Sequence, residues 1–196
     1  MNSLDHFLRE HAFAHRQTVA AADPFNMDYL VDGLTDSQLR VRPHGMNSIA
    51  WILWHIARVE DGFVSCVVLS RDQLFDQENW QERLGAPTRG VSTSKEAVAA
   101  LSESIALDVL WAYRDAVGRR TREGVTALWP DKWNAPIEAA DVRRAVAAGI
   151  CESEFEQFLP GKSRESALYW WGLHHTLMHL GQVGMLQGLV KTAAPA

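Results

Sequence analysis

The stretch Trp170-Trp-Gly-Leu-His174-His175-Thr-Leu-Met-His179-Leu-Gly-Gln182 holds the pattern that decides the fold of this chain. On a helix, His175 and His179 lie about one turn apart on the same face, with their rings aimed in one direction. Their neighbours are apolar side chains and glycine rather than charged residues, so this face is expected to be buried. An imidazole is costly to bury without a partner, and a divalent metal ion is a partner that binds two nitrogens at once.

A third histidine stands in a similar setting. His55 lies in the apolar run Ser48-Ile-Ala-Trp-Ile-Leu-Trp-His55-Ile-Ala, whose spacing predicts a helix with His55 on its core-facing side. His174 does not belong to the set, because it points about a quarter-turn away from the face of His175, and its separation of five residues from His179 lacks ligand geometry. Three neutral imidazoles form a mononuclear site that suits zinc, nickel or ferrous iron and leaves coordination positions open for water or substrate. The alternative is that these histidines pack in the core without a metal.

Two known helical metal chemistries are excluded by the residues present. Position 176 is Thr rather than Glu, so the helical zinc-protease motif lacks its general base. The chain contains no Glu-x-x-His, which excludes a carboxylate-bridged di-iron bundle. A bound thiol or water at an open position would lose its proton more readily, giving a nucleophile at neutral pH.

A second pair with the same spacing, His11 and His15, competes for the role of ligand. Its neighbours Arg9-Glu10 and Arg16-Gln17 are polar, so we expect this pair to be solvated or to lie at the rim of the pocket. Whether it lines the metal site stays open at this point.

The 196 residues are interpreted as one domain, 1–196, because helical periodicity dominates and no segment alternates at period two. The expected helices are 4–22, 23–33, one from Asn47 or Ser48 to Leu69, one from a Thr93/Glu96 capping box to Leu128, a short one near 141–148, and one from Ser163 or Ser166 to Val190. Four long helices joined by long connections predict an all-α four-helix bundle.

Charge and composition argue against some classes of binding partner. Nineteen basic against 24 acidic residues give a net charge of −5, with basic residues scattered, which argues against nucleic acid and anionic membrane as partners. The sequence shows neither a membrane-spanning apolar run nor a signal peptide, so a cytoplasmic location is expected. Cys66 and Cys151 lack the spacing of a zinc site or redox dithiol and are expected to be reduced thiols.

Two motifs together resemble a known family. The run Pro43-His-Gly-Met-Asn-Ser-Ile-Ala-Trp-Ile-Leu-Trp-His55-Ile-Ala-Arg-Val-Glu-Asp61 resembles the second-helix motif of the DinB-like superfamily of bacterial four-helix metalloproteins, and Leu173-His-His-Thr-Leu-Met-His-Leu-Gly-Gln182 resembles its last-helix motif. The segments 79–85 and 34–39 are similar to its connecting segments. The resemblance implies an up-down-down-up bundle, often a homodimer, with a divalent cation on His55, His175 and His179.

The resemblance also sets the functional expectation. Members with known activity include bacillithiol transferases and mycothiol-dependent maleylpyruvate isomerases, in which the metal activates a low-molecular-weight thiol. The leading hypothesis is therefore a metal-dependent thiol S-transferase or hydrolase acting on a small-molecule electrophile. Its cofactor is zinc or nickel, with iron or manganese as alternatives. The competing hypothesis is a non-catalytic metal- or ligand-binding helical module acting in a stress response.

Around the expected site, bulky and polar side chains are candidates for a pocket wall. Trp51 and Trp171 each lie about one turn from a ligand histidine, and Gln182 is a candidate polar group of the pocket. Glu60 and Asp61 lie off the His55 face and are interpreted as supporting or structural residues. No general base is identified, which fits a mechanism in which the metal supplies the activation.

Overall fold

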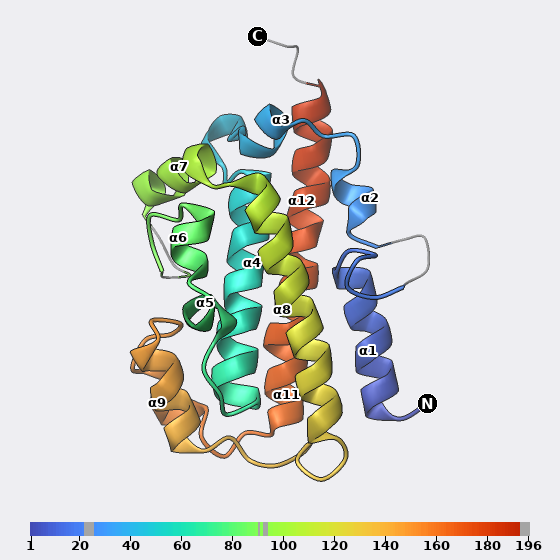
Figure 1. Cartoon of the computed structure of the whole chain (residues 1–196), viewed down its shortest axis with the longest axis vertical. Helices are drawn as coiled ribbons and strands as arrows, with labels where there is room; N and C mark the ends of the chain where they lie inside the picture. The colour runs from blue at the N-terminus through green and yellow to red at the C-terminus, as the bar shows by residue number, and fades with distance from the viewer. Residues whose placement is uncertain (22–25, 90, 92–93, 193–196) are drawn as a thin grey trace.

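The computed structural model describes residues 1–21, 26–89, 91 and 94–192. Within these residues the chain is helical and has no β-strand, which confirms the all-α class. The four long helices are α1 (Ser3–Ala14), α4 (Ile49–Phe63), α8 (Leu107–Leu128) and α12 (His175–Thr192). In Figure 1, α1 and α12 run toward the end of the molecule where the chain terminates, and α4 and α8 run in the opposite direction.

Shorter elements connect and extend these helices. They are α2 (Asp28–Val31), α3 (Asp36–Arg40), the 3₁₀ turn η1 (Pro43–Gly45), α5 (Leu74–Gln77), α6 (Trp80–Leu84), α7 (Lys95–Ser104), α9 (Ala139–Ala147), α10 (Phe155–Phe158) and α11 (Arg164–Tyr169). A π-helical turn, η2 (Val64–Val68), continues α4, and another, η3 (Trp170–His174), joins α11 to α12.

Serine caps begin α4, which carries His55, and α11, which leads through η3 to α12. The Ser48 Oγ accepts a hydrogen bond from the Trp51 backbone N–H at 3.0 Å, and the Ser163 Oγ accepts one from the Ser166 N–H at 3.1 Å. Each bond satisfies an N–H that has no partner within its own helix. Of the starting points left open by the sequence, Ser48 and Ser163 are therefore the correct ones.

The expected first helix, 4–22, is too long. The backbone leaves the helix after Ala14, and His15 is extended, with φ −123° and ψ 172°. The predicted restart at Asp23-Pro24 lies outside the described residues, and the only helix described within 23–33 is α2, which begins at Asp28.

The expected helix from Thr93 to Leu128 is also wrong, because it is divided into α7 and α8. Thr93 lies outside the described residues, and Ser94 caps α7 by accepting from the Ala97 N–H. Ile105 and Ala106 are extended between the two helices. The Arg40 guanidinium donates to the carbonyl oxygens of Ser102, Glu103 and Ile105, and so satisfies acceptors that the broken helix leaves free.

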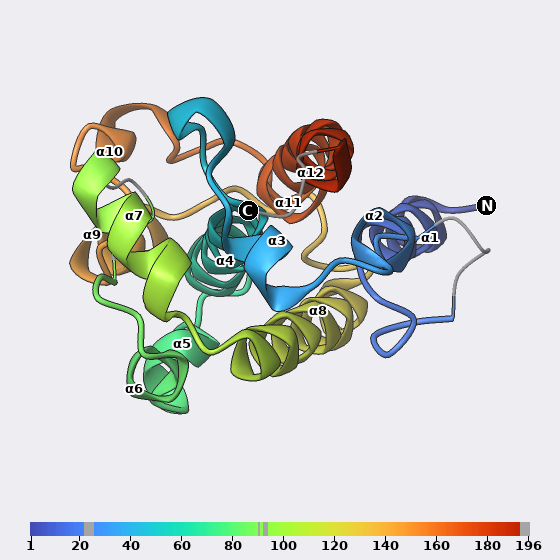
Figure 2. The ribbon, with the colours of Figure 1, turned by 90° about the horizontal axis from the view of Figure 1, so that it is seen from above.

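The core is built around α4. Every residue from Ile49 to Val68 is buried except His55, which is half-buried. Figure 2 shows α4 at the centre of the molecule with α8 and α12 beside it, and both helices contact it. No helix among the described residues has the length and hydropathy needed to cross a membrane.

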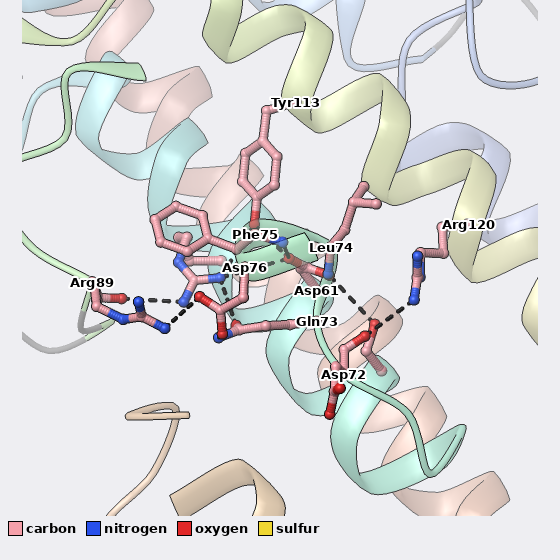
Figure 3. A network of polar contacts seen from close by, with 11 residues as sticks. Asp61, Asp72, Gln73, Leu74, Phe75, Asp76, Arg89, Tyr113 and Arg120 are labelled. Carbon is pink, nitrogen blue, oxygen red and sulfur yellow. Dashed lines mark hydrogen bonds and ion pairs between the residues drawn. The ribbon is translucent and has the colours of Figure 1, made fainter. Parts of the chain in front are cut away.

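Because α4 is buried all round, its charged side chains need internal partners. The Asp61 carboxylate accepts hydrogen bonds from the Leu74 and Phe75 backbone N–H groups and from the Tyr113 hydroxyl, each at 2.8 Å (Figure 3). The Arg58 guanidinium lies 3.7 Å from the centre of the Phe75 ring. These contacts fix α5 and α8 against α4 and use Asp61 structurally, as the sequence indicated.

Candidate metal centre

The structure brings His55, His175 and His179 together. Each offers one ring nitrogen, and the three nitrogens lie within 4.8 Å of one another. His55 comes from the middle of α4, whereas His175 and His179 occupy the first turns of α12. Ring centroids are separated by 5.1 Å for His55 and His175, 4.9 Å for His55 and His179, and 4.5 Å for His175 and His179. All three residues are half-buried, so the cluster lies at the edge of the core.

The rings meet at steep angles. Their planes differ by 52°, 77° and 68° in the three pairs, so none of the rings in this cluster stacks on another. A ring nitrogen binds a metal in the plane of its own ring. Steeply inclined rings with nearby nitrogens can therefore direct three lone pairs at one point.

Hydrogen bonds fix which nitrogen carries the proton in two of the rings. The His55 Nδ1–H donates to the Val91 carbonyl oxygen at 2.8 Å, and the His179 Nδ1–H donates to the Gln182 Oε1 at 2.9 Å. With the proton held on Nδ1, the Nε2 lone pair is free to bind a metal. The His175 Nδ1 is buried and has no hydrogen-bond partner among the described residues. A buried nitrogen without a partner fits a site that is completed by another group.

Burial also keeps two of the histidines, His55 and His175, neutral. Desolvation and the neighbouring His179 imidazole together lower the pKa of His55 to about 4, against a smaller opposing effect of the Val91 bond. Desolvation, followed by the imidazoles of His55 and His179, lowers the pKa of His175 to about 3. A metal ligand must be the neutral imidazole, so near pH 7 protons compete little with a metal for the nitrogens of His55 and His175. The donor set and its electrostatics fit a divalent metal.

The residues proposed for the pocket wall fall into two groups. Trp51 stacks on the His55 ring at 4.8 Å and 11°, and Gln182 bonds to His179. Trp171 instead stacks on Phe63, at 4.2 Å and 1°, two helical turns beyond His55. His174 is exposed and lies next to Trp170, outside the cluster, as its helical phase predicted.

The π-helical turn η3 ends at His174, so it immediately precedes the first ligand of α12. A π-turn holds one residue more than the α-helical turn that it replaces, and such turns are frequent at functional sites. Helical periodicity alone places α11 and α12 on one continuous α-helix and does not reveal this turn.

The prediction for His11 and His15 is wrong. Both residues are buried, with 0% and 2% of their surface exposed, rather than solvated or at a pocket rim. The His11 Nε2–H donates to Glu60 Oε1 and the His15 Nε2–H to Glu60 Oε2, each at 3.0 Å. The polar neighbours that misled the prediction point elsewhere, since Arg9 and Glu10 pair with each other at the surface.

The geometry of this second cluster differs from that of the first. The His11 and His15 rings are stacked at 4.1 Å and 23°, so their Nε2 atoms face the two oxygens of one carboxylate side by side. Burial raises the pKa of Glu60, but the two imidazoles outweigh it and hold that pKa well below its usual value. Burial and the adjacent His15 lower the pKa of His11 to about 4. The ligand atoms of His11, His15 and Glu60 also lie within 4.8 Å of one another, but here the two Nε2–H groups already bond to the carboxylate and make a hydrogen-bonded triad.

A comparison with known proteins finds one family whose model covers most of the chain. The family model of the DinB superfamily matches residues 22–183, a range that includes His55, His175, His179 and Glu60 but not His11 or His15. No curated protein matches the chain.

Proposed function

Because the chain belongs to the DinB superfamily, we propose that it is a metal-dependent enzyme. In this proposal a divalent ion on His55, His175 and His179 activates a low-molecular-weight thiol, or water, for transfer to a small electrophile. The observation that carries the proposal is the convergence of three imidazoles, two of which donate through Nδ1 to protein oxygens.

When bound, the ion acts as a Lewis acid that lowers the pKa of a thiol or water and so supplies a nucleophile near pH 7. Three protein ligands leave at least one coordination position for that group. Zinc and nickel suit the nitrogen donors, and iron or manganese would be weaker alternatives.

The chain's own residues orient and shield the ligands. The Val91 carbonyl and the Gln182 amide hold the His55 and His179 rings by their Nδ1 protons, and Trp51 covers one face of the His55 ring. The ring contacts and hydrogen bonds of the three imidazoles, among the described residues, involve no carboxylate. A site without a neighbouring carboxylate base favours activation by the ion itself.

The decisive experiment compares neighbouring histidines on one helix. We expect the purified protein and the His174→Ala variant to bind one equivalent of zinc or nickel, and His175→Ala to bind less than about a tenth of an equivalent, because a missing ligand weakens a three-ligand site severely. Elemental analysis after dialysis measures this. Equal metal content in all three proteins would contradict the proposed site.

Activity is tested separately with a panel of low-molecular-weight thiols and small electrophiles such as haloarenes and epoxides. We expect thiol consumption that requires added metal and disappears in His175→Ala. Stoichiometric metal without turnover for any pair would instead favour a non-catalytic metal-binding module.

We also propose a homodimer in which α12 forms part of the contact. The chain has no charged residue from Tyr169 to Val190. Leu177 and Met178 nevertheless expose 40% and 56% of their surface. An uncharged face suits a second copy of itself, since no like charges oppose each other across the axis. Sedimentation equilibrium should show a dimer that Leu177→Glu converts to a monomer, and a monomeric wild-type protein would contradict this proposal.

A further inference from the structure

A cavity of about 290 Å³ lies between α4 and α12, which run side by side in Figures 1 and 2. Ile52, in its wall, lies one turn before His55 on the same helix, and Gln182, also in its wall, bonds to His179. The cavity is therefore in contact with both helices that supply the ligands.

The wall of the cavity is uncharged. Six described residues line it, and they are Met46, Asn47, Ile52, Gln182, Met185 and Leu186. Four of these side chains are apolar, and the other two are amides that can donate or accept hydrogen bonds without carrying a charge. Arg42 is close in sequence, but its guanidinium donates to the carbonyl oxygens of Gly45 and Met46.

We propose that this cavity binds a neutral, mainly apolar group of the substrate and discriminates against charged groups. The proposal deepens the proposed function and rests on it for the role of the bound molecule. A charged group entering the cavity would lose hydration without gaining an ion-pair partner, whereas a neutral ring or short alkyl group would bury apolar surface against methionine, isoleucine and leucine. The volume is near the lower end of that of small-molecule sites, so a compact group fits.

Flexible methionine side chains suit such a role. Met46 is half-buried and Met185 is 55% exposed, so both can move to fit different shapes. Gln182, in the wall of the cavity, accepts a hydrogen bond from His179 through its amide oxygen and retains its NH₂ group as a donor. The substrate class that these features indicate is a neutral aromatic or alkyl electrophile with one weak hydrogen-bond acceptor.

The test uses three probes of one shape and three charges: benzyl alcohol, benzoate and benzylammonium. The chain contains five methionines, and their ¹³C-labelled methyl NMR signals report on different parts of the molecule. We expect benzyl alcohol to shift the Met46 and Met185 signals and to leave those of Met27, which is buried against Arg114, and Met178, which is exposed on α12, unchanged. Benzoate and benzylammonium should bind at least about tenfold more weakly.

Titrations are made on the full chain both without metal and with added zinc. The metal-free titration tests the cavity separately from the proposed function. Failure to bind zinc would contradict the metal site, whereas the probe affinities measured without metal would still test the cavity. Equal affinity for all three probes, or equal shifts of Met178 and Met185, would overturn the inference.

Substitutions at an exposed position of the wall give a second measurement. Met185→Lys introduces a cation at the cavity, so it should weaken the binding of benzyl alcohol and strengthen the binding of benzoate. Met46 is then the remaining NMR reporter in the wall. Met185→Leu keeps the wall neutral and should retain the preference for benzyl alcohol. An unchanged order of affinities in Met185→Lys would show that the wall does not select the charge of the ligand.

Discussion

Two pairs of histidines in this chain share the spacing His-x-x-x-His and differ in almost everything else. His175 and His179 meet His55 with rings inclined at 52° to 77°, and their nitrogens converge. His11 and His15 stack at 23° and donate in parallel to Glu60. The spacing determines only that two rings share a side of the chain.

The difference lies in what the facing helix supplies. Opposite His175 and His179, α4 presents a third imidazole. The three nearby ring nitrogens then have no N–H group among them to which their lone pairs could bond. Opposite His11 and His15, the same helix presents a carboxylate five residues further on, which accepts two N–H groups. The first cluster presents nitrogen lone pairs that a cation can bind, whereas in the second the two Nε2–H groups are satisfied by the two oxygens of Glu60.

The largest expected effect comes from removing the carboxylate of the second cluster. Glu60→Ala leaves two buried N–H groups without an acceptor and should lower the free energy of unfolding by about 3–5 kcal/mol, measured by urea denaturation. Metal content should stay at one equivalent per folded chain. The exposed Glu103→Ala should change stability by less than about 0.5 kcal/mol. Loss of metal in a folded Glu60→Ala variant would show that Glu60 contributes to metal binding and would contradict the distinction between the two clusters.

The converse effect should appear when metal is added. Zinc at about a hundred times its dissociation constant should raise the free energy of unfolding by about 2.7 kcal/mol. This gain should vanish in His175→Ala and persist in His11→Gln, where the amide N–H can still donate to Glu60. Urea denaturation with zinc and with a chelator measures both. A stabilisation by zinc that was lost in His11→Gln would show that the ion binds at the second cluster and contradict the proposed site.

A dependence on pH should distinguish the buried triad from its surroundings. The pKa of His11 is about 4 in the folded protein against an ordinary value of 6.5, so between these values the unfolded chain binds more protons. Stability is therefore lost as the pH falls through this window. From pH 7 to pH 5, in a chelator, the wild-type protein should lose roughly 2 kcal/mol more than His11→Gln, in which this titration is absent. Parallel curves would show that His11 is not buried as a neutral imidazole.

The smallest effect is expected from the residue that orients a ligand. Gln182→Leu removes the acceptor of the His179 Nδ1 proton and should weaken zinc binding about tenfold, as determined by competition with a chelator. Gln187, on the same helix, donates to the Tyr29 carbonyl away from the cluster, so Gln187→Leu should leave the affinity unchanged. Identical zinc affinities in the two variants would show that Gln182 does not support His179 as a ligand.

Much of the helical framework was predictable because its signals are local. Ser48 and Ser163 precede apolar periodic runs and cap them as expected, and helical phase separated His174 from His175. Which histidines come together depends on the packing of distant helices, and here phase and apolar context sufficed for His55, His175 and His179.

The predictions failed where partners lie far away in the sequence. Neighbours of His11 along the chain are polar, yet on a helix they face other directions, so they say little about its own environment. A better signal was Glu60, a carboxylate within a run of apolar residues from Ile49 to Val68, which must find buried donors. The break at Ile105 depends on Arg40, more than sixty residues earlier, and no local pattern contains it.

The number of residues in the π-turn η3 determines which way the histidines that follow it face. An α-helix rotates by about 100° per residue, so a turn with one residue more than its neighbours resets the angular position of everything that follows it. If the same residues formed an uninterrupted α-helix from Arg164 onward, His175 and His179 would be rotated together by about 100° away from α4, with their mutual spacing intact and His55 left alone. Deleting one residue between Trp170 and His174 should instead remove the π-turn and leave the two ligands facing α4, because the shorter regular helix reaches His175 at the same angle. The length of this segment, and not the ligands alone, therefore assembles the site.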